Sequence, residues 1–136
     1  MVSDAPSVRE LVISALDPGA RVTELNRGAA VRAAVAAEPP DLAIIDLQVG
    51  KMGGMATCLD LRLEEGGGRL PHVPVLMLLD RRADVFLGRR ARAEGWLVKP
   101  LDVLRLRRAA AAVLAGGTYE DEAYRPVTVP LPSSAT

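Results

Sequence analysis

Two uninterrupted apolar runs constrain the fold of this chain more than any other feature. Residues 42–46 read LAIID, and residues 73–79 read VPVLMLL. Apolar runs of this length without an alternating polar face are typical of strands buried on both faces, as in a parallel sheet covered by helices. The two runs therefore predict a layered α/β domain.

Helical patterns alternate with these runs along the chain. Residues 6–16, for example, carry apolar side chains at the i, i+3, i+4, i+7 spacing of an amphipathic helix. Helices are expected at residues 6–16, 29–38, 55–65, 82–94 and 102–115, and short strands at 21–25 and 96–98. Alternating strands and helices with short connections favour parallel pairing through right-handed crossovers, with helices on both faces of the sheet.

The alternation ends near residue 115. Residues 116–136 are rich in Gly, Pro, Ser and Thr and show little helical pattern. Segments of this composition bury too little apolar surface to offset the entropy of ordering them. We therefore expect one domain over residues 1–115 and an unstructured tail over 116–136.

Charge and composition exclude several function classes. The chain has 17 Lys and Arg against 17 Asp and Glu, so its balance gives no general reason to expect a nucleic acid or an anionic membrane as partner. Cys58 is the only cysteine, which rules out an intrachain disulfide. No apolar run approaches the ~18 residues of a membrane span, and no secretory leader pattern is present. A cytoplasmic location is expected.

Charged residues follow the predicted strands at the point where each strand ends. Asp46 ends the first apolar run, Asp80 follows the second, and Lys99 follows the short strand at 96–98. Ligand sites of open parallel sheets lie beyond the carboxyl ends of the strands, so these side chains are expected to converge. A carboxylate here can attack phosphorus, a second one such as Asp4 can help hold Mg²⁺, and a lysine can bind a phosphoryl oxygen.

Four segments, in this order, resemble the receiver domain of two-component response regulators over roughly residues 1–115. They are SDAPSVREL at 3–11, LAIIDLQVGKMGG at 42–54, VPVLMLLD at 73–80 and GWLVKP at 95–100. The resemblance implies a doubly wound, flavodoxin-like fold. Its parallel sheet would have five strands in the order 2-1-3-4-5, with helices on both faces.

The resemblance also implies roles for individual residues. Asp46 would be the phosphoacceptor, and Lys99 would contact the phosphoryl group. Mg²⁺ would be held by Asp4, Asp46 and the backbone carbonyl of Gln48, although Asp4 is equally suited to cap the first helix. Trp96 stands at the aromatic switch position, where we expect a partly exposed side chain.

Three departures from the family pattern bear on these roles. Ser3 stands where the family usually has a second acid, so Mg²⁺ is expected to bind more weakly. Leu79 replaces the Ser or Thr whose hydroxyl binds the aspartyl phosphate, which puts its coupling to Trp96 in doubt. Asp80 adds negative charge nearby and is expected to disfavour a phosphoryl group, unless it points to solvent or to Arg81 or Arg82.

The first strand is expected to be very short or truncated, because only residues 1–3 precede Asp4. This strand is central in the family, and each buried backbone group left unpaired there would cost about 1–3 kcal/mol. Either the chain starts upstream of residue 1, or another segment substitutes. The segment 126–130 has strand-like residues, but its prolines suit an edge better than a centre.

The leading interpretation is a single-domain response regulator in phosphorelay signal transduction. It would accept a phosphoryl group on Asp46 from a histidine kinase or phosphotransfer protein. It would then act on an unknown output protein by protein–protein contact, with a possible homodimer through the face of the fourth helix, fifth strand and fifth helix. The alternative is a pseudo-receiver that binds partners constitutively, without phosphorylation.

Other function classes find less support in the sequence. An aspartate-nucleophile phosphohydrolase would need an acid two residues after Asp46, where Gln48 stands. We therefore expect no enzymatic activity beyond phosphorylation and dephosphorylation of Asp46 itself. No helix-turn-helix pattern follows residue 115, so no DNA-binding domain is expected.

Overall fold

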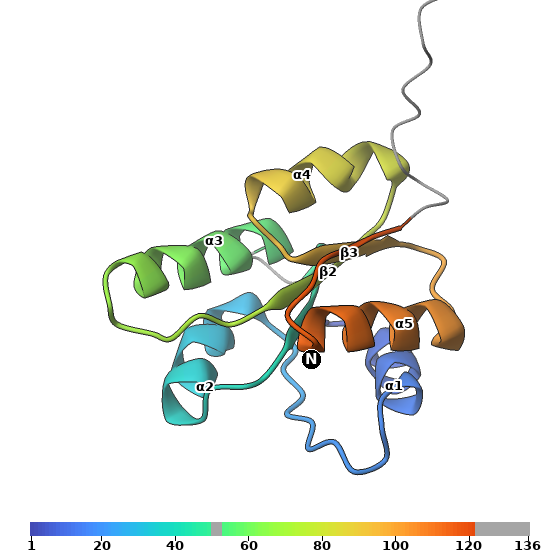
Figure 1. Cartoon of the computed structure of the whole chain (residues 1–136), viewed down its shortest axis with the longest axis horizontal. Coiled ribbons are helices and arrows are strands. Elements are labelled where there is room, and N and C mark those ends of the chain that lie inside the picture. The colour runs from blue at the N-terminus through green and yellow to red at the C-terminus, as the bar shows by residue number, and fades with distance from the viewer. Residues whose placement is uncertain (50–52, 122–136) are drawn as a thin grey trace, which may run out of the picture.

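A parallel β-sheet forms the middle layer of the computed structural model, which describes residues 1–49 and 53–121 (Figure 1). The strands are β1 (Ala43–Asp46), β2 (Val75–Leu79), β3 (Gly95–Val98) and β4 (Tyr119–Glu120). The helices are α1 (Pro6–Ala15), α2 (Val31–Ala37), α3 (Gly54–Gly66), α4 (Val85–Arg90) and α5 (Val103–Leu114), with 3-10 turns at Gly28–Ala30 and Arg82–Asp84. The predicted α/β class with a parallel sheet is confirmed.

The described strands lie in the order β1-β2-β3-β4, and every pairing is parallel. All residues of β1 and β2 are buried, as expected for the two apolar runs. Alternate residues of β2 face opposite sides: Met77 packs in a cluster with α2, α3 and α4, whereas Leu76 packs in a cluster with α1 and α5. Figure 1 shows the same division of the helices over the two faces.

The very short first strand is present and lies at the centre of the sheet. Val2 forms parallel bridges to Leu25 on one side and to Ile45 on the other. Its N–H donates to Ile44 O and its carbonyl accepts from Asp46 N, both at 2.9 Å. Three residues thus pair the buried backbone groups on both sides, in the place that the order 2-1-3-4-5 assigns to the first strand. Residues 126–130, considered above as a substitute, lie outside the described residues.

Two predicted elements are shorter in the structure. The strand expected at 21–25 is reduced to the single bridge at Leu25. The helix expected at 82–94 is a 3-10 turn followed by α4, which ends at Arg90; Arg92 then adopts the left-handed region at φ 57°. None of the described helices is long and apolar enough to cross a membrane.

The chain folds back onto the sheet after α5, in a segment expected to be unstructured. Tyr119–Glu120 pairs with β3, and the Asp121 side chain is only 3% exposed. Asp121 accepts a hydrogen bond from Val98 N at 3.2 Å and is also bonded to the Arg105 guanidinium of α5. The expectation of a tail from residue 116 is therefore wrong for 119–121, because a buried carboxylate fixes them to β3. Residues 122–136 lie outside the described part.

Gly54 begins α3 directly against the end of β1. Its N–H donates to Leu47 O at 2.9 Å. A Cβ at this position would lie 2.4 Å from Asp46 O and 2.8 Å from Leu47 Cα, both backbone atoms. Only glycine allows the helix to start this close to the strand that carries Asp46.

We expect Gly54→Ala to lower the free energy of unfolding by on the order of 1–3 kcal/mol, because the backbone must move to admit the methyl group. Urea denaturation followed by circular dichroism measures this. The matched control is Gly66→Ala, where a Cβ would meet nothing within 4 Å. Equal stability of the two variants would contradict the close approach at Gly54.

We expect Asp121→Ala to lower the free energy of unfolding by about 1–3 kcal/mol, because it removes the side-chain acceptor of Val98 N and one of several acceptors of Arg105. The same denaturation experiment measures it, with the exposed Asp41→Ala as control. If both variants unfold like the parent chain, residues 119–121 do not contribute to the folded domain in solution.

Candidate functional site

Three charged side chains from three segments meet at the carboxyl edge of the sheet. Asp46 is the last residue of β1, Asp80 follows β2, and Lys99 follows β3. The Lys99 Nζ lies 2.8 Å from Asp46 Oδ1 and 2.9 Å from Asp80 Oδ1. The ammonium group therefore bridges two carboxylates that parallel pairing brings to the same edge.

The Asp46 carboxylate is buried, with 1% of the residue exposed, and donors contact both of its oxygens. Ser3 Oγ donates to Oδ2 at 2.7 Å, and Gln48 N donates to Oδ1 at 3.2 Å in addition to Lys99. Ser3 is itself buried, and its hydroxyl oxygen accepts from Ala5 N at 3.1 Å. These hydrogen bonds offset the cost of removing a carboxylate from water.

Lys99 stays a cation in this setting. Burial by itself lowers the pKa of its ammonium group, but the hydrogen bonds and charges of Asp46 and Asp80 outweigh burial and raise that pKa above its ordinary value. The Lys99–Pro100 peptide bond is cis, and Lys99 N donates to Leu79 O at 2.8 Å. The amine is thereby held over the ends of two neighbouring strands.

Asp80 lies toward the site. Its carboxylate bonds Lys99, so it adds negative charge near Asp46 as expected, although 26% of its side chain is exposed to solvent. Its Oδ2 is buried and has no hydrogen-bond partner within the described part of the chain. The position of Asp80 directly after a predicted strand was enough to predict that it lies at this edge. The direction of its side chain could not be predicted, because it depends on the contact with Lys99.

The residues expected to hold Mg²⁺ can supply two carboxylates and one carbonyl. A carboxylate oxygen accepts about two hydrogen bonds, so Asp46 Oδ1 is saturated and Oδ2 keeps one free position. Mg²⁺ commonly uses one or two carboxylates and keeps several waters. Asp46 Oδ2, the exposed Asp4 and the Gln48 carbonyl therefore offer the kind of oxygen donor that such an ion prefers.

Two further observations concern the metal site and the alternative role of Asp4. Within residues 1–49 and 53–121, no group of three or more His, Cys, Asp and Glu could hold a metal ion. The position that caps α1 is Ala5, one residue later than the capping alternative for Asp4 requires.

The two switch positions are closed into the core. Leu79 is fully buried, and Trp96 is 5% exposed and belongs to the same apolar cluster, so the expectation of a partly exposed Trp96 is wrong. Gly88 of α4 leaves the space for the indole, since a Cβ there would lie 3.2 Å from the ring. The Arg89 guanidinium lies 5.6 Å from the ring centroid, within the range of a cation–π contact.

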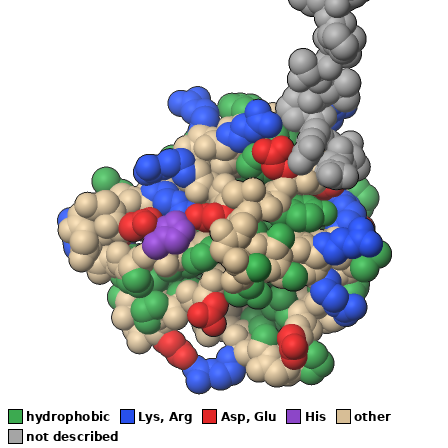
Figure 2. Space-filling model, viewed as in Figure 1, with side chains coloured by type: hydrophobic (Ala, Val, Ile, Leu, Met, Phe, Trp, Pro, Cys, Tyr) green, Lys and Arg blue, Asp and Glu red, His purple; other side chains and the backbone are tan. Residues whose placement is uncertain are grey.

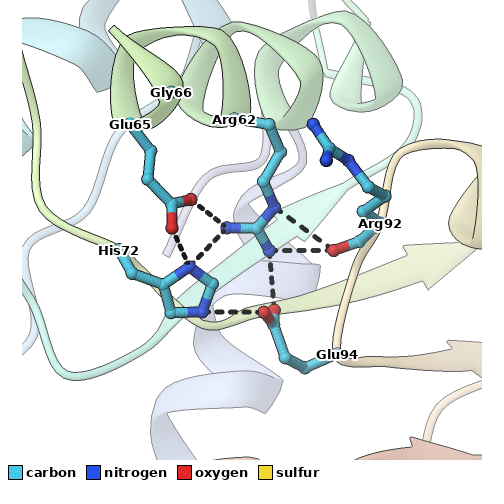
Figure 3. Close-up of a pocket in the computed structure, with 6 residues that line it drawn as sticks. All are labelled: Arg62, Glu65, Gly66, His72, Arg92 and Glu94. Atoms are coloured by element: carbon cyan, nitrogen blue, oxygen red, sulfur yellow. Dashed lines mark hydrogen bonds and ion pairs between the residues drawn. The ribbon is translucent and has the colours of Figure 1, made fainter. Parts of the chain in front are cut away.

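A second polar cluster lies at the opposite edge of the sheet and was not anticipated from the sequence (Figure 3). The nearly buried Arg62 donates to the backbone carbonyls of Val73 and Arg92 and to Glu94 Oε2, at 2.7–3.2 Å. His72, in the loop before β2, lies between Glu65 and Glu94 at 2.8 and 2.9 Å. Figure 2 shows this single histidine at the surface between acidic side chains.

This second cluster, which we call the Arg62 clamp, ties α3 to the sheet. Glu94 Oε2 also accepts from Val75 N at 2.6 Å, so one carboxylate ties α3 to the starts of β2 and β3. The Arg62 nitrogens all have acceptors, which leaves no donor directed toward a ligand. The candidate site is therefore the group of charged side chains formed by Asp46, Asp80 and Lys99.

Known proteins share both the sequence pattern and the fold. The model of the response regulator receiver domain matches residues 1–111. The transcriptional regulatory protein CseB of Streptomyces avermitilis is 34% identical over 116 residues, which are 83% of this chain and 47% of that protein. The DNA-binding dual master transcriptional regulator RpaA of a Synechocystis strain is 32% identical over 117 residues, which are 84% and 47% of the two chains.

Solved receiver structures superpose on most of the described chain. The signal receiver domain of the putative response regulator NarL from Mycobacterium tuberculosis has a TM-score of 0.72 at 28% identity, covering 85% of this chain and 93% of that one. The chemotaxis response regulator CheY4 of Vibrio cholerae has a TM-score of 0.72 at 27% identity, covering 82% and 93%.

The present chain spans about half the length of the curated relatives it matches. The family match extends over residues 1–111, which include both strand ends that carry Asp46 and Lys99. The chain therefore belongs to the response regulator receiver domain family of two-component systems.

Proposed function

We propose that this receiver domain accepts a phosphoryl group on Asp46 in a phosphorelay. The observation that carries the proposal is the buried Asp46 carboxylate with Lys99 Nζ at 2.8 Å, in a chain of the receiver family. An Asp46 oxygen would attack the phosphorus of a phosphohistidine on a histidine kinase or phosphotransfer protein. A new P–O bond forms, the P–N bond breaks, and the imidazole nitrogen keeps the electron pair.

Lys99 would act as the fixed positive charge of this step. Its raised pKa keeps it protonated at neutral pH, and an ammonium binds phosphoryl oxygens as a point charge. Mg²⁺, when held by Asp4, Asp46 and the Gln48 carbonyl, supplies further neutralisation of phosphoryl charge. Ser3 contributes a neutral hydroxyl in place of an acid, so the metal site is weaker than one with a second acid there.

The output of the domain would be a protein–protein contact in the cytoplasm. Its relatives RpaA and CseB are described as DNA-binding or transcriptional regulators, and each is about twice as long as the present chain. Any homodimer through α4, β3 and α5 would have to accommodate β4, which pairs with β3 on that edge. We propose no enzymatic activity beyond turnover of the phosphoryl group on Asp46.

A second candidate is a constitutive, phosphorylation-independent interaction module. It is favoured by position 79, where a fully buried leucine replaces the hydroxyl that would bind the aspartyl phosphate. Trp96 packs against Gly88 and Arg89 of α4, so its rotation would have to displace that helix. In this reading the Asp46–Lys99 pair holds the strand ends together and takes no part in signalling.

Treatment with acetyl phosphate and Mg²⁺, followed by intact mass measurement, separates the two candidates. We expect one added phosphoryl group, as the P–O bond to acetate breaks and acetate leaves with the electron pair. Asp46→Asn should show none, because an amide is a far weaker nucleophile. Asp60→Asn, which alters a remote carboxylate of α3 paired with Arg32, should keep the adduct. No adduct on the parent chain at any donor concentration would favour the constitutive module.

A further inference from the structure

The proposed function leaves one charged group of the site without a role. Asp80 contacts Lys99 at 2.9 Å, so Lys99 is shared between two carboxylates before any phosphoryl group arrives. The two contacts of 2.8 and 2.9 Å also limit the distance between the two carboxylates, since both bond the same nitrogen. With two acids and one base in contact, this part of the site carries net negative charge.

A phosphoryl group on Asp46 would need the same ammonium. The phosphoryl group carries between one and two negative charges at neutral pH, while Asp46 loses the charge of its own carboxylate. The site therefore gains up to about one negative charge, next to an Asp80 carboxylate that already neutralises much of the charge of Lys99. The hydroxyl that could otherwise help bind it is missing, because position 79 is a buried leucine. The charge balance at Lys99 therefore decides how well a phosphoryl group is bound.

The hydrogen bond between Asp80 and Lys99 can break without leaving the Asp80 carboxylate buried and unpaired. Only Oδ1 bonds Lys99, while the buried Oδ2 has no partner within the described residues. A carboxylate oxygen held away from water without a hydrogen bond is costly, so moving this side chain to water would satisfy it. The side chain is already 26% exposed, which gives it a route to solvent.

We propose that Asp80 is an internal competitor of the phosphoryl group for Lys99, which sets how readily Asp46 is phosphorylated. The inference rests on the proposed function of Asp46. Asp80 holds the ammonium while Asp46 is unmodified, and it must release the ammonium when the phosphoryl group binds. Asp80 is thus a positioning residue that acts through Lys99.

The test compares the initial rate of adduct formation on the full chain with acetyl phosphate and Mg²⁺, followed by intact mass. We expect Asp80→Asn to raise the rate by at least about tenfold, because it removes a unit charge at contact distance from Lys99. Asp80→Ala should behave alike, whereas Asp80→Glu keeps the charge and should stay near the parent rate. The matched control Asp60→Asn should leave the rate unchanged.

The possible outcomes are distinct. Equal rates for the parent chain, Asp80→Asn and Asp80→Ala, with the adduct on Asp46, would overturn the competitor role and leave Asp46 as the phosphoacceptor. An equal rise in Asp80→Glu would also overturn it, since the charge would then be irrelevant. No adduct on any variant would refute the proposed function and the competitor role together. An adduct that appears only when Asp80 is neutralised would support the competitor role, and it would favour the constitutive module as the function of the parent chain.

Discussion

The contact between Lys99 and Asp46 is the interaction on which the rest of the structure's chemistry depends. It joins the ends of β1 and β3 across β2, and it supplies the opposite charge that a carboxylate with 1% exposure requires. Ser3 completes the arrangement from the central three-residue strand. The site therefore exists only when segments from four parts of the chain have paired in the correct register.

The parts of the fold that sequence patterns predicted are those with strong local signals. β1 and β2 are buried apolar runs, and α1 has clear helical spacing, so each was expected within a few residues of its observed bounds. The missed elements have almost no local signal. β4 was missed because it has two residues, whose strand character comes from β3 and from Asp121 rather than from their own sequence. The strand expected at 21–25 was too long, since a single bridge at Leu25 remains of it.

The site shows the same division between local and long-range information. Strand ends place Asp46, Asp80 and Lys99 at one edge, which is a consequence of parallel topology and can be predicted. The direction of Asp80 cannot, because it follows from the position of the Lys99 ammonium. The burial of Trp96 depends on Gly88 in another element, and the Arg62 clamp depends on carbonyls that only the folded chain brings near.

A double-mutant cycle between Asp46 and Lys99 tests this account most directly. The free energy of unfolding is measured for the parent chain, Asp46→Asn, Lys99→Met and the double variant. Lys99→Met removes the contact of Lys99 with Asp80 both in the parent chain and in Asp46→Asn, so this contact cancels from the coupling. We expect a coupling of roughly 1–3 kcal/mol between the two positions, as for a hydrogen bond between charged groups. Additive effects, within about 0.5 kcal/mol, would contradict it.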